Sequence, residues 1–106
     1  MKRREFIINR IVDALNQTEP NSELYLYGSR ARGTSKKSSD WDLLILLNSD
    51  QLTFDYETEL LDRFYDVELE TGEVISPLIY LKKDWISMHS ATPLYSNISK
   101  EGIKLK

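Results

Sequence analysis

Two aspartates one residue apart, Asp40 and Asp42, are the side chains whose spacing best suits metal chemistry. They stand at the head of an apolar run, Leu43 to Leu47, and therefore begin a predicted strand. Residues i and i+2 of a strand project to one face, so the two carboxylates lie side by side while Trp41 points into the core. Magnesium relieves the repulsion between such carboxylates and keeps both ionised. We expect Asp40 and Asp42 to be catalytic metal ligands, although an Asp-x-Asp pair by itself also fits a solvated strand end.

A Gly-Ser pair upstream, Gly28 and Ser29, is suited to hold a phosphate. Glycine lets the backbone approach an anion closely, the serine hydroxyl is a donor, and the N–H groups that open a helical turn carry partial positive charge. Arg30 and Arg32 can add charge. A Gly-Ser turn alone is also a common link between strand and helix. The aspartates downstream favour the phosphate interpretation, because protein-bound magnesium often holds substrate phosphates.

The elements that must position these residues alternate along the chain. Ile8, Ile11, Val12 and Leu15 have the spacing of an amphipathic helix. Pro20 should lie beyond its end. The patterns of the first half predict a helix over 2–17, a strand over 23–27, a helical turn over 29–32 closed by Gly33, a polar loop over 34–39, and a central strand over 40–48.

The second half contains one ambiguous segment. Residues 54–71 have the apolar spacing of a helix ended by Gly72, yet alternation near their end would also suit the first arm of a hairpin; we favour the helix. Pro77 places the strand over 73–81 at a sheet edge or a bulge. Asp84 is the expected N-cap of a short helix to 89, Pro93 begins another that ends at Gly102, and 103–106 form a short strand or a tail. This order predicts an α/β or α+β fold, a small mixed sheet flanked by helices.

Composition limits the class of protein. The chain has 106 residues, of which 41% are hydrophobic, so we expect one domain over 1–106. The net charge of -3 does not favour direct nucleic-acid binding, apart from local basic clusters. There is no cysteine, and no apolar run is long enough to span a bilayer. We therefore expect a soluble, cytoplasmic protein that does not bind membranes.

The central stretch resembles the DNA polymerase beta nucleotidyltransferase superfamily, and most closely its small bacterial minimal nucleotidyltransferases. The signature of that family is a Gly-Ser turn, an Ala-Arg-Gly segment, a loop, and then Ser-Asp-x-Asp-Leu. In this chain it stands as Gly28 to Gly33, a loop over 34–38, and Ser39-Asp40-Trp41-Asp42-Leu43. The resemblance spans most of the chain and implies the nucleotidyltransferase fold.

The resemblance also implies a reaction, in which an acceptor hydroxyl attacks the α-phosphate of a nucleoside triphosphate such as ATP and releases pyrophosphate. Gly28 and Ser29 would hold the β- and γ-phosphates, with Arg30, Arg32 and Ser39 in the same nucleotide-binding motif. Asp40 and Asp42 would ligate two Mg²⁺ ions. Small members of this family resemble the antitoxin half of a pair with a HEPN-type helical toxin, so the acceptor is expected to be such a partner protein.

A third carboxylate of the family pattern is missing or displaced. It usually lies on the next strand, and the corresponding position here falls near Ser76. The acidic residues that could substitute are Asp66, Glu68, Glu70 and Glu73. If none of them reaches the metal, an alternative function is that of a catalytically degenerate module that binds a nucleotide and acts through a partner protein.

Overall fold

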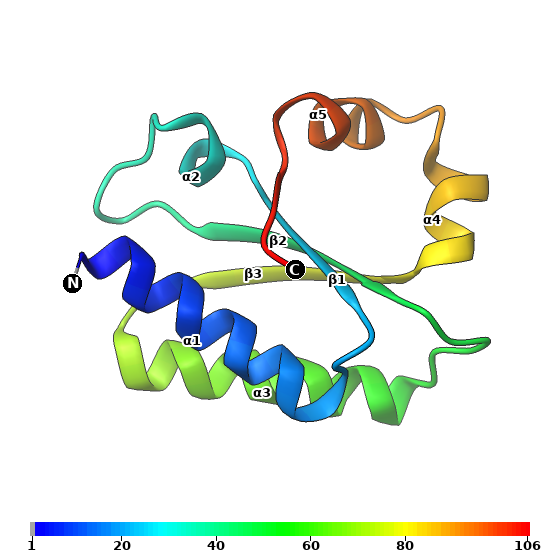
Figure 1. The fold of residues 1–106 in the computed structure, drawn as a ribbon, viewed down its shortest axis with the longest axis horizontal. Coiled ribbons are helices and arrows are strands. Elements are labelled where there is room, and N and C mark those ends of the chain that lie inside the picture. The colour runs from blue at the N-terminus through cyan, green and yellow to red at the C-terminus, as the bar shows by residue number, and fades with distance from the viewer. Residues whose placement is uncertain (1) are drawn as a thin grey trace.

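The computed structural model describes residues 2–106, apart from the Met88 side chain. Figure 1 shows a sheet between two groups of helices, with α1 and α3 on one side and α4 and α5 on the other. The elements are α1 (Arg3–Thr18), β1 (Glu23–Tyr27), α2 (Ser29–Arg32), β2 (Trp41–Leu47), α3 (Phe54–Thr71), β3 (Ile75–Leu81), α4 (Lys82–His89), α5 (Pro93–Glu101) and β4 (Ile103–Lys104). This is an α+β fold with a mixed sheet, as the sequence predicts.

The sheet has the order β3-β2-β1-β4. β1 pairs antiparallel with β2 and with β4, whereas β2 and β3 are parallel. β2 is therefore a central strand, and β3 is an edge strand that tolerates Pro77. The register places Tyr27 opposite Asp42 on one side of β2 and Ser76 opposite Asp42 on the other.

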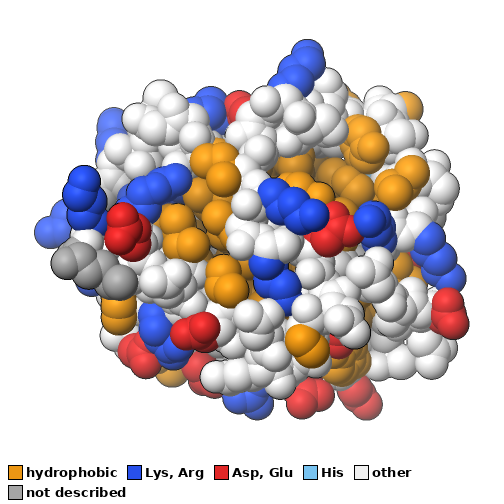
Figure 2. Space-filling view, in the orientation of Figure 1, with side chains coloured by type: hydrophobic (Ala, Val, Ile, Leu, Met, Phe, Trp, Pro, Cys, Tyr) orange, Lys and Arg blue, Asp and Glu red, His pale blue; other side chains and the backbone are white. Residues whose placement is uncertain are grey.

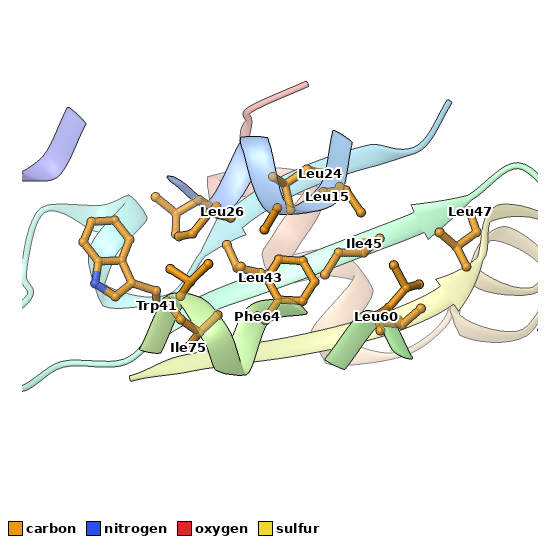
Figure 3. Close-up of a cluster of buried hydrophobic side chains, with 14 of the residues drawn as sticks. Leu15, Leu24, Leu26, Trp41, Leu43, Ile45, Leu47, Leu60, Phe64 and Ile75 are labelled. Atoms are coloured by element: carbon orange, nitrogen blue, oxygen red, sulfur yellow. The ribbon is translucent and has the colours of Figure 1, made fainter. Parts of the chain in front are cut away.

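The two faces of β2 enter different parts of the core. Its odd-numbered residues, such as Leu43 and Ile45, pack with α1 and α3, and Figure 3 shows Phe64 and Leu60 of α3 against them. Its even-numbered residues, Leu44 and Leu46, pack with Trp85 and Ile98 from α4 and α5. Burial on both faces accounts for the unbroken apolar run from 43 to 47.

α3 settles the ambiguity over 54–71. The segment is one helix, begun by the Thr53 side chain, which accepts from the Tyr56 N–H, and ended by Gly72 at φ 76°. The hairpin alternative is therefore wrong. Burial of Leu60, Phe64 and Val67 on one face decides for the helix, because their spacing suits a period of 3.6 and not of 2.

One helix begins earlier than the sequence predicts. β3 runs directly into α4, whose N-cap is Leu81, so Asp84 lies in the first turn and is not the cap. A carboxylate there still favours the helix, through the partial positive charge of its N-terminus. α5 starts at Pro93, as predicted, and Thr92 is its N-cap. Of the two alternatives for the last residues, a short strand or a tail, the structure shows the short strand β4.

Aromatic side chains join α4, α5 and β3. Trp85 is buried and stacks on Tyr95 and His89, with ring centroids 5.3 and 5.2 Å away, and Tyr80 packs against the same cluster. Within residues 2–106, no helix combines the length and apolar character needed to cross a lipid bilayer.

Candidate active site

Gly28 connects β1 to α2 in a conformation that only glycine adopts readily, with φ 73° and ψ -158°. It lies directly against Asp42, and a Cβ atom added to Gly28 would collide with the Asp42 carboxylate. The glycine is thus required both by the backbone angles and by the space. This contact brings the predicted phosphate turn and the predicted metal ligand together.

The helical turn after Gly28 is closed by its own backbone. The N–H groups of Ala31 and Arg32 both donate to the Gly28 carbonyl, and those of Gly33 and Thr34 donate to the Ser29 carbonyl. Gly33 ends the turn in the left-handed conformation, at φ 80°. α2 is therefore a preformed single turn that begins beside Asp42.

Asp42 lies at the start of β2, on the side of the sheet covered by α4 and α5, and Asp40 immediately precedes the strand. The Ser76 hydroxyl of β3 donates a hydrogen bond of 3.1 Å to Oδ2 of Asp40. Trp41 points to the opposite side and is 2% exposed. Two carboxylates and a hydroxyl form a set of hard oxygen donors, which suits Mg²⁺.

The electrostatics of the pair also suit a cation. Burial and the nearby charge of Asp40 raise the pKa of Asp42, and Arg32 opposes part of that shift. The protein therefore holds Asp42 where its ionised form is disfavoured without a positive charge. A divalent cation between the two carboxylates would remove that cost.

The four acidic residues that could supply a third carboxylate are engaged elsewhere. Glu68 accepts from the Ile75 N–H, and the other three pair with arginines: Asp66 with Arg63, Glu70 with Arg10, and Glu73 with Arg3 and Arg30. In the described part of the chain, no cluster of three or more acidic, histidine or cysteine side chains could hold a metal ion. At the expected position, next to Asp40, the chain has Ser76.

Arg30 and Arg32, two residues apart on a helical turn, point to different sides of β2. Arg32 forms an ion pair of 3.0 Å with Glu101 of α5 and is close enough to Asp42 to affect its pKa. Arg30 lies over the Trp41 ring, 4.6 Å from its centroid, and its side chain is only 13% exposed. Arg32 thus lies on the same side of β2 as the two aspartates, and Arg30 lies on the other side, with Trp41.

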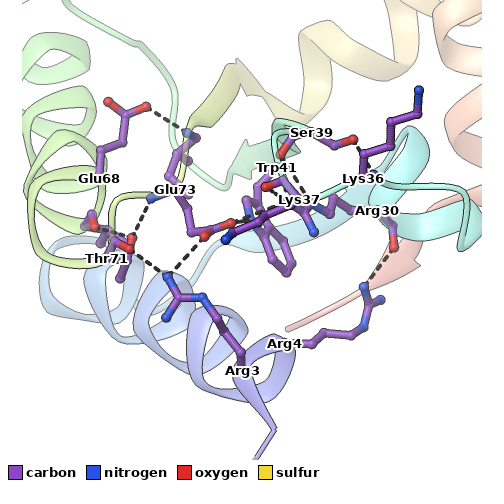
Figure 4. A network of polar contacts seen from close by, with 12 residues as sticks. Arg3, Arg4, Arg30, Lys36, Lys37, Ser39, Trp41, Glu68, Thr71 and Glu73 are labelled. Atoms are coloured by element: carbon purple, nitrogen blue, oxygen red, sulfur yellow. Dashed lines mark hydrogen bonds and ion pairs between the residues drawn. The ribbon is translucent and has the colours of Figure 1, made fainter.

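Arg30 anchors the loop that carries the aspartates. Its guanidinium donates to the carbonyl oxygens of Ser39, at 2.8 Å, and Lys37, and it pairs with Glu73 (Figure 4). Ser39 adds a second restraint, because its hydroxyl accepts from the Lys36 N–H at 2.8 Å. These contacts fix the loop immediately before Asp40.

Glu73, which the sequence offered as a possible third metal ligand, belongs to this network instead. Its carboxylate accepts from Trp41 Nε1 at 2.9 Å and from Arg3 at 3.1 Å, and it faces Arg30 at 3.4 Å. The Trp41 hydrogen bond, Arg3 and Arg30 lower the pKa of Glu73 despite its burial. The sequence signal for Glu73 is its place two residues before β3, but its pairing with Trp41 depends on the fold.

Tyr27 is a second residue that sequence reasoning missed. It is opposite Asp42 in the sheet, and burial, followed by the charge of Asp42, raises its pKa to about 12. Tyr27 therefore stays protonated at neutral pH and places an uncharged side chain next to Asp42. Its position immediately before the Gly-Ser turn is the signal that could have identified it.

Comparisons with known proteins identify a family and similar folds. The chain matches the Nucleotidyltransferase domain family over residues 8–105. Among solved structures it resembles a toxin–antitoxin protein with AMP-PNP, at TM-score 0.65 and 22% identity, over 93% of this chain and 72% of the other. It also resembles the toxin–antitoxin MntA–HepT, at TM-score 0.59 and 18% identity, over 96% of this chain and 71% of that one. No curated protein sequence matches the chain.

Proposed function

Because this chain belongs to the nucleotidyltransferase domain family, we propose that it transfers a nucleoside monophosphate from a nucleoside triphosphate to a hydroxyl, with Mg²⁺. We also propose that residues 1–106 act as one such domain. The observation that carries the proposal is the contact between Gly28 and Asp42. It brings a turn suited to phosphates against a carboxylate suited to magnesium.

Each residue of the motif has a role in this proposal. Gly28 and Ser29 bind the β- and γ-phosphates, and Asp40 and Asp42 are the catalytic metal ligands. Arg32 adds positive charge on the same side of β2. Arg30 and Ser39 contribute to nucleotide binding through the loop that they hold rigid before Asp40.

The reaction follows from this arrangement. The acceptor oxygen forms a bond to the α-phosphorus, the bond to the bridging β-phosphate oxygen breaks, and pyrophosphate leaves with that electron pair. The acceptor proton passes to a carboxylate or to solvent. When bound, a pair of Mg²⁺ ions would stabilise the attacking and leaving oxygens. The chain itself mainly positions the triphosphate and disfavours other geometries.

The proposed acceptor is a hydroxyl of a partner protein. Two similar folds come from toxin–antitoxin proteins, one of them with the ATP analogue AMP-PNP. They support ATP as the donor and a toxin protein as the partner; that this toxin is of the HEPN type is part of the proposal and rests on the family resemblance. The proposed location is the cytoplasm, where nucleoside triphosphates are supplied.

A second candidate function rests on Ser76. A serine hydroxyl carries no negative charge, so it cannot do what a carboxylate does as a charged metal ligand or as a proton acceptor. The Ser76 hydroxyl also already donates to Asp40. In this alternative the chain binds Mg²⁺ and a nucleotide but transfers little or nothing, and it acts by association with its partner.

Transfer of label distinguishes the two candidates. The purified protein is incubated with Mg²⁺, a HEPN-type partner and each nucleoside triphosphate labelled at the α-phosphate. The enzyme should label the partner, and Asp40→Ala or Asp42→Ala should abolish labelling, whereas Asp13→Ala on the surface of α1 should not. Nucleotide binding without labelling would instead support the second candidate.

A further inference from the structure

α3 exposes a stripe of large apolar side chains to solvent. Phe54 is 81% exposed, Leu69 67%, Tyr65 56% and Leu61 38%. Leu61, Tyr65 and Leu69 are spaced by four residues, and Phe54 precedes Leu61 by seven, so all four share one face of the helix. A separate face of the same helix, with Leu60, Phe64 and Val67, is buried in the core. α3 is therefore apolar on two faces, of which only one has a partner among the described residues.

A groove continues the stripe toward the sheet edge. It has a volume of about 310 Å³, and Leu61 and Tyr65 of α3 line it together with Ile75 and Pro77 of β3. β3 is an edge strand, so no further strand of the sheet covers this side. The stripe and the groove share Leu61 and Tyr65, and the groove is also lined by the acidic residues Asp62 and Glu68. Exposed apolar side chains rimmed by polar residues are typical of interaction sites on soluble proteins.

The charges around the stripe are almost all negative. α3 contains one basic residue, Arg63, and seven acidic residues: Asp55, Glu57, Glu59, Asp62, Asp66, Glu68 and Glu70. At 100° per residue, Glu57 and Glu68 border the stripe on one side, and Asp55, Asp62 and Asp66 border it on the other. In Figure 2, acidic side chains gather along the lower edge of the molecule, where Figure 1 places α3.

The negative charge around the stripe limits which kind of molecule can bind to it. A second copy using the same surface would bring two strongly acidic rims together, and nucleic acid or an anionic membrane would be repelled. A basic partner gains attraction at both rims. Its apolar side chains must recur at helical spacing to match a stripe of this length, as in helix-in-groove recognition.

We propose that the face of α3 formed by Phe54, Leu61, Tyr65 and Leu69 docks an amphipathic helix of a partner protein whose apolar face is flanked by lysine or arginine. The surface lies on the side of the sheet opposite Asp40 and Asp42, so docking leaves the aspartates accessible. The proposal gives the partner protein of the proposed function a contact surface, but it rests only on α3 and β3.

A synthetic Leu/Lys peptide with helical apolar spacing tests this surface, without nucleotide or metal, so the result does not depend on transfer. Its affinity for the full chain is measured by fluorescence anisotropy, and bound amides are mapped by NMR. We expect saturable binding that shifts amides of α3, weakens with salt, and falls about tenfold in Leu69→Ser, as for loss of one buried leucine. The matched control, Ile86→Ser on α4, exchanges a half-exposed apolar residue elsewhere and should leave binding unchanged.

Charge is tested separately with Asp62→Asn, which should weaken binding, against Asp13→Asn on α1, which should not. A peptide with the same composition in scrambled order, without helical spacing, should bind more weakly. Equal binding of the scrambled peptide, equal loss in Ile86→Ser, or sedimentation showing dimers that Leu69→Ser dissociates would overturn the proposal. The last result would assign the stripe to a second copy of this chain.

Discussion

The Ser76 hydroxyl donates a 3.1 Å hydrogen bond to Oδ2 of Asp40. Ser76 is also opposite Asp42 in the parallel pairing of β2 with β3. The side chain nearest to both aspartates on the third strand is therefore uncharged. This relationship suits nucleotide and metal binding, and it means that the third strand supplies no carboxylate next to Asp40 for the transfer step.

Ser76→Asp should accelerate transfer. The added carboxylate can bind the metal and accept the acceptor proton, a contribution of about 10²-fold for a positioned general base. Without metal, three neighbouring carboxylates should lower the thermal midpoint, and Mg²⁺ should restore it. Initial rates of label transfer and melting curves with and without Mg²⁺ measure both effects. Ser76→Asn controls for side-chain size, and equal rates in the two variants would contradict the expected role.

Gly28→Ala should both destabilise the fold and impair nucleotide binding. The backbone strain alone is about 1–3 kcal/mol. The added Cβ would also displace Asp42. Gly33→Ala is the matched control, because its φ of 80° is also positive but the added Cβ meets no atom of a residue distant in the chain within 4 Å. Urea unfolding and ATP titration should show a stability loss in both variants and a binding loss only at Gly28; binding retained in Gly28→Ala would argue against the turn as a phosphate site.

Asp42→Asn should stabilise the metal-free protein at neutral pH. Because burial and Asp40 raise the pKa of Asp42, the folded state binds this proton more tightly than the unfolded state. Stability therefore falls as the pH rises from the usual aspartate value of 3.8 through the raised pKa, and the substitution removes that loss. Unfolding free energies at pH 4 and pH 7 in EDTA test the sign. A variant less stable than the natural chain at pH 7 would refute it.

Glu73→Gln should destabilise the protein by about 1–3 kcal/mol, as for loss of hydrogen bonds to a charged group. The pKa of Glu73 is lowered by Trp41, Arg3 and Arg30, so its contribution is present above the usual value of 4.5 and is lost as the pH falls through the lowered pKa. The difference from the natural chain should shrink in acid.

Glu70→Gln provides the comparison, because Glu70 is half-exposed in its pair with Arg10 and should contribute less than about 1 kcal/mol. Equal losses in the two variants, or a Glu73→Gln effect that does not change with pH, would mean that Glu73 does not anchor the network.

The sequence predicted the parts of the site that depend on local structure. The helical turn after Gly28 and the common side of Asp40 and Asp42, opposite Trp41, follow from periods of 3.6 and 2. These two features are encoded by residues close in the chain, and the fold shows both of them. The place of Ser76 beside Asp40 was instead predicted from the family resemblance, because the two residues are 36 positions apart and meet only when β2 pairs with β3.

The remaining features depend on contacts distant in sequence. The pairing of Glu73 with Trp41, Arg3 and Arg30 joins the segment before β3 to β2, α1 and α2, and no local pattern indicates it. The N-cap of α4 was misplaced at Asp84 because β3 continues into the helix without a break, so tertiary pairing and not the capping preference sets the boundary. The exposed side of α3 likewise emerges only when its other face is seen to be buried.

Calorimetric titration of ATP into the natural chain and Asp42→Asn, with and without Mg²⁺, tests the central claim most directly. If Gly28, Asp40 and Asp42 form one site for a metal-bound triphosphate, the natural chain binds ATP in the presence of Mg²⁺ and the variant does not. Equal Mg²⁺-dependent binding by both proteins, or no binding by the natural chain, would contradict the account.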